Sequence, residues 1–283
     1  MRIKKHQNRN EYAVTSDGMW VRNLCKQDVL YFDINNLIAE KDCQLFLLNE
    51  VNHKSRSIND ITFPVQKKVV IISDGYDFNK KQQLLEKLNN DIAIIAVNGA
   101  LKKWKYADKK ERYKRRMNWY VVNNPYPECQ KFLPQHDFYP NCIMATRTNS
   151  DFAKKYKGII HLYHPTPTNI FKGLQNESGI YIDDYRNPIC AAISIAYKMK
   201  AEKIMLFCCD DSFADKRPLA EQLENGLWSY PQQQISHRVI DAMAYWLKLN
   251  NIVLADHSSC AKYEHVPYIA VEDFVKYFGD END

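Results

Sequence analysis

From Lys67 to the end of the chain, short apolar runs alternate with amphipathic segments, a pattern that few folds accept. Runs rich in β-branched residues predict strands at 68–73 and 91–98, and the segment between them, 77–90, has helical periodicity. The same alternation predicts strands at 119–123, 142–147, 158–163, 202–211 and 252–256, and helices at 150–157, 187–200, 236–251 and 271–278. In the helix at 187–200, Asn187 is the expected N-cap and Pro188 the first helical residue. We therefore expect an α/β fold, with a Rossmann-like, mostly parallel sheet that carries helices on both faces.

Residues 1–66 do not follow this alternation. Their clearest signal is a β-hairpin at 11–23, with Ser16, Asp17 and Gly18 at its turn. The segment 52–66 is the best candidate for a linker. The sequence thus predicts a small N-terminal α+β accessory region at 1–66 and a Rossmann-like domain at 67–283.

The composition bears on the expected location of the protein in the cell. The chain has 283 residues, contains no run of 18 or more apolar residues, and has no apolar stretch behind its basic N-terminus. We therefore expect no membrane span and no secretory signal, and we expect a cytoplasmic protein. The eight cysteines include no C-x-x-C pair, which favours buried reduced thiols over a zinc ribbon or a disulfide scaffold.

The positive charge is concentrated in one segment. Between Lys102 and Arg116, nine basic residues face two acidic ones, with tyrosine and tryptophan among them. Such a segment suits a polyanion, because lysine and arginine neutralise phosphates and aromatic rings stack on bases. The alternative is a solvated, lysine-rich helix. The residues expected to bind an acceptor or a polyanion are Lys102, Lys103, Lys105, Arg112, Lys114, Arg115 and Arg116.

Polar residues follow four of the predicted strands, where ligands bind in an open parallel sheet. The candidate nucleotide-binding residues are Ser73, Asp74, Gly75, Asn98, Gly99, Asn123 and Asn124. The chain has neither a G-x-G-x-x-G nor a G-x-x-x-x-G-K-[ST] motif, so a standard dinucleotide site or P-loop is not expected. The turn at 73–75 either contacts a phosphate or only reverses the chain.

Two carboxylates, Asp210 and Asp211, follow the strand at 202–211. They suit a divalent metal ion that bridges phosphate oxygens, or one of them suits a general base. Capping of the next helix is the alternative. His164, at another predicted strand end, is a further candidate base.

The order of these motifs resembles a known family. "KVVIISDGYDFN", "AVNGAL", "NNPYPE" and "NPICAAISIAYKMKAEKIMLFCCDDSF" resemble elements of the 6-hydroxymethylpterin diphosphokinase MptE-like family, which is related in fold to bacterial sialyltransferases and flagellin accessory glycosyltransferases. The likeness covers about 67–279. It implies that Gly75 occupies the place of a glycine-rich phosphate loop and that Asn98 and Gly99 lie by the nucleotide. It also implies that Asp210 or Asp211 matches the carboxylate at the end of the family's corresponding strand motif.

The resemblance implies a nucleotide-binding transferase domain at 67–283 that moves a diphosphate or a sugar. Glycosyl transfer from a nucleotide sugar to a hydroxyl acceptor is favoured, because the chain has no D-x-D and places asparagines at the strand ends. The acceptor is left open and includes modified DNA. One alternative is diphosphate transfer from ATP, for which Mg²⁺ would be the cofactor. The other is a non-catalytic nucleic-acid-binding protein.

Overall fold

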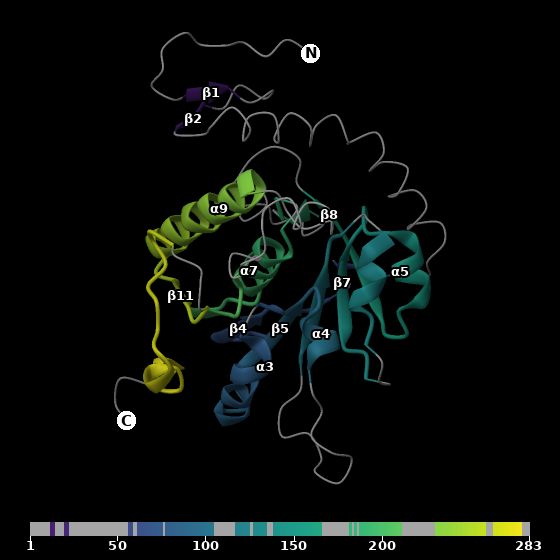
Figure 1. The fold of residues 1–283 in the computed structure, drawn as a ribbon, viewed down its shortest axis with the longest axis horizontal. Helices are drawn as coiled ribbons and strands as arrows, with labels where there is room; N and C mark the ends of the chain where they lie inside the picture. Colours follow the sequence, from purple (N-terminus) through teal and green to yellow (C-terminus); the bar gives the residue numbers. More distant parts are fainter. Residues whose placement is uncertain are drawn as a thin grey trace.

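The computed structural model describes residues 12–14, 20–22, 56–58, 61–75, 77–104, 117–124, 127–134, 138–165, 181–182, 184–185, 187–210, 230–258 and 263–278. Seven strands of this part of the chain form an all-parallel sheet (Figure 1). Across the sheet they are β11 (Val253–Asp256), β10 (Lys203–Phe207), β4 (Lys68–Ile72), β5 (Ala93–Val97), β6 (Trp119–Val122), β7 (Asn141–Ala145) and β8 (Ile160–Pro165). The two-residue strands β3 (Arg56–Ser57) and β9 (Tyr181–Ile182) pair with β8. The predicted α/β fold is confirmed.

The strand order reverses in the middle of the sheet. The chain runs outward from β4 through β5, β6 and β7 to β8, and then returns to place β10 on the other side of β4, with β11 beyond it. In open parallel sheets, ligands bind beyond the carboxyl ends of the strands at such a reversal. The topology therefore directs attention to the residues that follow β4 and β10.

Helices cover both faces of the sheet (Figure 1). One face packs against α7 (Pro188–Lys198) and α9 (Tyr230–Leu249), and the other against α3 (Phe78–Lys81), α4 (Ala100–Lys103) and α5 (Ser150–Lys155). Successive strand residues alternate between them, so Val69 and Ile71 face α7 while Val70 and Ile72 face α3. Because both faces are buried, the strands read as continuous apolar runs.

Helix α7 begins where its sequence predicts. The side chain of Asn187 caps it by accepting a hydrogen bond from the backbone N–H of Ile189 at 2.8 Å, and Pro188 occupies the first helical position. The helix is buried on nearly all sides, because its small residues allow close contact with the sheet. The predicted cap and start are thus confirmed.

Two segments predicted as helices are wholly or partly 3₁₀ helices in the structure. The segment predicted as one helix at 77–90 is the four-residue α3 followed by the 3₁₀ helix η2 (Gln82–Lys87). Its buried Leu85 and Leu88 are three residues apart, the spacing that a 3₁₀ helix places on one face. The predicted helix at 271–278 is two 3₁₀ turns, η4 (Val271–Asp273) and η5 (Lys276–Phe278). A further 3₁₀ helix, η3, spans Pro127–Phe132.

Parts of the predicted N-terminal region are described. Strands β1 (Tyr12–Val14) and β2 (Trp20–Arg22) pair antiparallel, as the predicted hairpin requires, and the predicted turn lies outside the described residues. Strand β3 also belongs to 1–66, yet it pairs with the main sheet. The domain boundary after residue 66 stays a prediction. In the described part of the chain, no helix is both long and apolar enough to cross a membrane, and the five described cysteines are buried and form no disulfide.

Candidate nucleotide-binding site at the carboxyl edge of the sheet

The turn after β4 is joined to the end of β10. The backbone N–H of Gly75 donates to the carbonyl oxygen of Cys208 at 3.0 Å, and the N–H of Ser73 donates to that of Phe207 at 3.1 Å. A methyl group on Gly75 would lie 2.5 Å from Oδ2 of Asp210 and would overlap the Cys208 carbonyl oxygen. Only glycine allows this approach, so two of the predicted site elements meet at the reversal of strand order.

The turn after β5 reaches the same place. A side chain on Gly99 would overlap the carboxylate of Asp74. Nζ of Lys103, on α4, donates to the backbone oxygen of Asp74 at 2.7 Å and lies 3.9 Å from its Oδ2. Burial raises the pKa of Asp74, while Lys103 opposes that shift. Lys103 was predicted to bind a polyanion. In the structure, its ammonium group lies beside Asp74 at the strand ends.

Asn98 offers an acceptor at the same edge. Its backbone is in the left-handed region, with φ of 48°, and its carbonyl oxygen accepts a hydrogen bond from the hydroxyl of Tyr120 at 3.0 Å. Its side-chain Oδ1 is buried and has no hydrogen-bond partner within the described residues. A buried polar atom in this state is costly unless a ligand or water satisfies it. Asn98 is therefore placed to accept a hydrogen bond from a bound molecule.

A short chain of hydrogen bonds links β10 to β11. The N–H of Cys209 donates to Oγ of Ser258 at 2.8 Å, and that hydroxyl donates to Oδ1 of Asp256 at 2.5 Å. The N–H of Ser258 reaches the same oxygen at 3.0 Å. Asp210 and Asp256 are both buried. The carboxyl edge of the sheet thus carries a carboxylate at the end of β11 and one just after each of the neighbouring strands β10 and β4.

Lys81 brings positive charge to this group. It lies on α3, and its Nζ donates to the backbone oxygen of His257 at 3.2 Å. The pKa of Asp256 is raised to about 7, chiefly by burial; the Ser258 hydrogen bonds and Lys81 oppose this rise, whereas the Asp210 charge adds to it. Burial also lowers the pKa of His257. Lys81 and Lys103 therefore approach the strand ends from two helices on one face.

The pKa of Asp256 predicts a dependence of stability on pH. Because its folded-state pKa is raised above the ordinary value of 3.8 to about 7, the folded state binds more protons than the unfolded state between these values. The free energy of unfolding should therefore fall as the pH rises through this window, by at most about 1.4 kcal/mol per pH unit from this group. Denaturant titrations of the wild type and Asp256→Asn at pH 5 and pH 8 measure it. Equal losses in both proteins would contradict the assignment.

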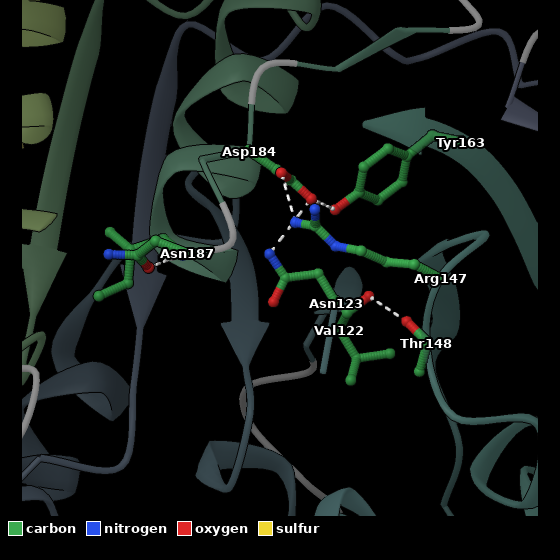
Figure 2. A network of polar contacts seen from close by, with 8 residues as sticks. Val122, Asn123, Arg147, Thr148, Tyr163, Asp184 and Asn187 are labelled. Atoms are coloured by element: carbon green, nitrogen blue, oxygen red, sulfur yellow. Dashed lines mark hydrogen bonds and ion pairs between the residues drawn. The ribbon is translucent and has the colours of Figure 1, made fainter. Parts of the chain in front are cut away.

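A second polar cluster lies at the ends of β6, β7 and β8 (Figure 2). Nη2 of Arg147 and Oδ1 of Asp184 form an ion pair at 2.6 Å, with side chains 6% and 2% exposed. Asp184 also accepts hydrogen bonds at its Oδ2 from the hydroxyl of Tyr163 at 3.0 Å and from Nδ2 of Asn123 at 3.3 Å. Burial, with the Asp184 charge, raises the pKa of Tyr163. Figure 2 shows these side chains converging on Asp184.

This cluster fixes the chain just before α7. The carbonyl oxygen of Asp184 accepts from the N–H of Asn187, the cap of α7, at 2.6 Å. Thr148 Oγ1 donates to the carbonyl oxygen of Val122 at 3.2 Å, and the carbonyl oxygen of Asn124 accepts from the N–H of Asn149 at 3.0 Å. Asn123, predicted to contact a nucleotide, directs its amide to Asp184. Its expected contact with a ligand stays a prediction.

Of the remaining predicted residues, some belong to the described part of the chain and others lie outside it. Lys102 is an exposed residue of α4, and His164 belongs to β8, paired with Tyr181 of β9. Outside the described residues lie Asp211, Lys105, Arg112, Lys114, Arg115 and Arg116. Among the residues that are described, no group of three or more His, Cys, Asp or Glu side chains is arranged to hold a metal ion. The expected metal ligation by Asp210 and Asp211 stays a prediction, because Asp211 is not among them.

Three residues at this edge, Lys81, Asp256 and Ser258, were not among those predicted from the sequence. Asp256 had a usable signal, because it ends a predicted strand and a polar "HSS" follows it. Lys81 had none, because it is one of several lysines on an amphipathic segment. The Arg147–Asp184 pair joins residues 37 positions apart and was not foreseen.

The fold is similar to that of a glycosyltransferase. The likeness is to the MAf glycosyltransferase from Magnetospirillum magneticum AMB-1, with a TM-score of 0.50 and 11% sequence identity over 75% of this chain and 35% of that one. The chain thus spans about a third of that protein, and at this identity the likeness shows the fold alone. No protein-family model matches the chain, and no curated protein matches it in sequence. Membership of the MptE-like family is therefore not shown, whereas a Rossmann-like parallel sheet similar to that of a glycosyltransferase is.

Proposed function

We propose that this chain is a glycosyltransferase that binds a nucleotide sugar where the strand order reverses, between β4 and β10. The observation that carries the proposal is the contact between Gly75 and the end of β10, which brings the β4 turn against Asp210. The likeness of the fold to that of a glycosyltransferase supports it. Open α/β sheets place nucleotides at such a reversal.

The charges at this edge suit such a donor. Lys81 and Lys103 supply positive charge toward the donor's phosphates. Asp74 and Asp210 are acceptors for ribose or sugar hydroxyls, and Oδ1 of Asn98 accepts from a base or sugar. The donor is thereby held by acceptors at the strand ends and by two cations from one helical face.

In the proposed reaction, an acceptor hydroxyl oxygen forms a bond to the anomeric carbon as the bond from that carbon to the phosphate oxygen breaks. The nucleotide leaves with the bonding electrons, and a carboxylate takes the hydroxyl proton. Asp256 suits this role, because its pKa of about 7 lies near the operating pH of most enzymes. Asp210, Asp211 and His164 remain the other candidate bases.

A second candidate is diphosphate transfer from ATP, as the resemblance to the MptE-like family implies. The observation that favours it is the presence of Asp74, Asp210 and Asp256 at the ends of three adjacent strands. Mg²⁺ bound to ATP needs only one or two protein carboxylates, because the phosphates supply the other ligands, and these strand ends offer such carboxylates. A nucleic-acid acceptor, or a non-catalytic nucleic-acid-binding role, depends on the segment 102–116, of which only 102–104 is described.

A ligand panel distinguishes these candidates. Thermal unfolding is measured with nucleoside monophosphate sugars, nucleoside diphosphate sugars and ATP, each with and without Mg²⁺. We expect a nucleotide sugar at 100 times its Kd to stabilise the fold by about 2.7 kcal/mol, and slow hydrolysis of the same donor. A shift with ATP that requires Mg²⁺ would instead favour the diphosphokinase.

Charge reversal at Arg112, Lys114, Arg115 and Arg116 tests whether the acceptor is a polyanion. Retained donor hydrolysis with lost transfer to DNA would indicate a polyanionic acceptor. Salt-sensitive DNA binding without any nucleotide shift would contradict the transferase altogether.

A further inference from the structure

A pocket of about 1010 Å³ lies beside β11, next to the proposed donor site. Its described lining comes from α9, from the end of β11 and from the segment 263–268. Small-molecule sites span about 300–1,000 Å³, so this pocket has room for more than one sugar ring. It adjoins β11, which lies two strands from β4, so Asp256 is about 10 Å from Ile71, the β4 residue in register with it.

The pocket presents aromatic rings to solvent. Tyr245 and Tyr268 are 54% and 56% exposed, although most large apolar side chains in the described residues are buried. The Tyr245 ring lies 5.7 Å from that of His265, and the Tyr268 ring stacks on that of His257 at 6.1 Å and 17°. Both rings are therefore supported from one side while they stay open to a ligand. An exposed ring with a hydroxyl tip suits the C–H face and the hydroxyl groups of a sugar.

The pocket also offers a carboxylate oxygen. Both hydrogen bonds that the Asp256 side chain accepts, from the N–H and the hydroxyl of Ser258, end on Oδ1. None of the described residues donates to its Oδ2. Asp256 and Ser258 are both lining residues. Oδ2 can therefore accept a hydrogen bond from a hydroxyl group in the pocket.

The charges of the lining argue against a polyanion. Its described charged residues are one lysine, Lys248, and two carboxylic acids, Asp256 and Glu264. A DNA or phosphate ligand needs a positive surface, and this lining has no excess of positive charge. A neutral molecule rich in hydroxyl groups fits the same lining without this penalty.

We propose that the β11 pocket is the acceptor subsite and binds a neutral carbohydrate, stacked on Tyr245 and Tyr268 with one hydroxyl hydrogen-bonded to Asp256. This assignment rests on the proposed glycosyl transfer, and it names the class of acceptor. The pocket is tied to the donor side of the sheet, because the hydroxyl of Tyr263 donates to the carbonyl oxygen of Cys209 at 3.3 Å. This hydrogen bond places one wall of the pocket beside the end of β10.

Saturation-transfer NMR on the full chain tests the assignment. The probes are the methyl glycosides of glucose, galactose, mannose and N-acetylglucosamine, together with maltotriose, each at up to 10 mM. We expect at least one probe to bind, with a tenfold or larger loss of affinity in Tyr268→Ala and in Tyr245→Ala. Val271→Ala is the matched control, because Val271 is exposed nearby but does not line the pocket, and it should bind as the wild type does.

Asp256→Asn provides the second variant, and thermal unfolding of each variant confirms that it is folded. Binding by none of the probes, or binding that neither tyrosine substitution weakens, would overturn the carbohydrate subsite. Donor binding measured in the same samples separates the two proposals. A protein that binds a nucleotide sugar but no carbohydrate refutes the subsite alone. Carbohydrate binding at the tyrosines without any nucleotide-sugar binding supports a carbohydrate site in the pocket but refutes the transferase, and with it the role of acceptor subsite.

Discussion

Replacement of Arg147 by methionine is expected to lower the free energy of unfolding by about 3–5 kcal/mol. Its guanidinium and the carboxylate of Asp184 form a buried pair at 2.6 Å. Methionine fills much of the volume but leaves the Asp184 charge buried without its cation, and desolvation of an uncompensated charge is the main penalty. Chemical denaturation followed by fluorescence measures the change.

Two control variants make this result specific. Lys67→Met breaks the pair with Glu202 at 2.9 Å, whose side chains are 68% and 60% exposed, and should change stability by no more than about 1 kcal/mol. The double variant Arg147→Met with Asp184→Asn removes both charges, so it should recover part of the loss. A double variant less stable than Arg147→Met would show that the hydrogen bonds from Asn123 and Tyr163, and not the charge balance, dominate the cluster.

The fold could be predicted because its signals are local. Apolar runs predicted all seven long strands, and Asn187 with Pro188 predicted the start of α7. The 3₁₀ form of η2 could not be predicted, because it depends on how Leu85 and Leu88 reach the sheet and not on their periodicity alone. Local patterns therefore predicted whether each segment is helical or extended, but not the geometry that tertiary packing imposes.

The site could be predicted only in part, because the sequence does not show the order of the strands in the sheet. Polar residues after strands indicated Asp74, Gly75 and Asp210 separately, but periodicity does not say that β10 lies beside β4. Asn123 shows the opposite case, because its position suggested a ligand contact while its amide is hydrogen-bonded to Asp184. Residues that act through distant partners carry no local signal, and single-sequence patterns cannot find them.

Replacement of Gly75 by alanine is expected to reduce turnover of the nucleotide donor by about 100-fold, since a shift of 1 Å in a binding element can have an effect of this size. The added methyl group would overlap the carbonyl oxygen of Cys208 and lie 2.5 Å from Oδ2 of Asp210. The first of these is backbone and cannot rotate away, so β4 and β10 must separate at their ends. The stability loss should be about 1–3 kcal/mol, as for other overpacked sites. Donor hydrolysis and thermal shift, measured together, give both quantities.

Two further alanine substitutions separate the site from simple crowding. Gly158→Ala, before the amino end of β8, would place a methyl group 2.7 Å from Cε1 of Tyr156 and 2.9 Å from the carbonyl oxygen of Pro140. It should destabilise the fold comparably but leave donor affinity intact, because it lies at the opposite edge of the sheet. Gly99→Ala crowds only the movable carboxylate of Asp74, so it should affect donor binding more than stability. If Gly158→Ala weakened donor binding as much as Gly75→Ala, the turn after β4 would have no special part in holding the nucleotide, because loss of stability alone would explain both results.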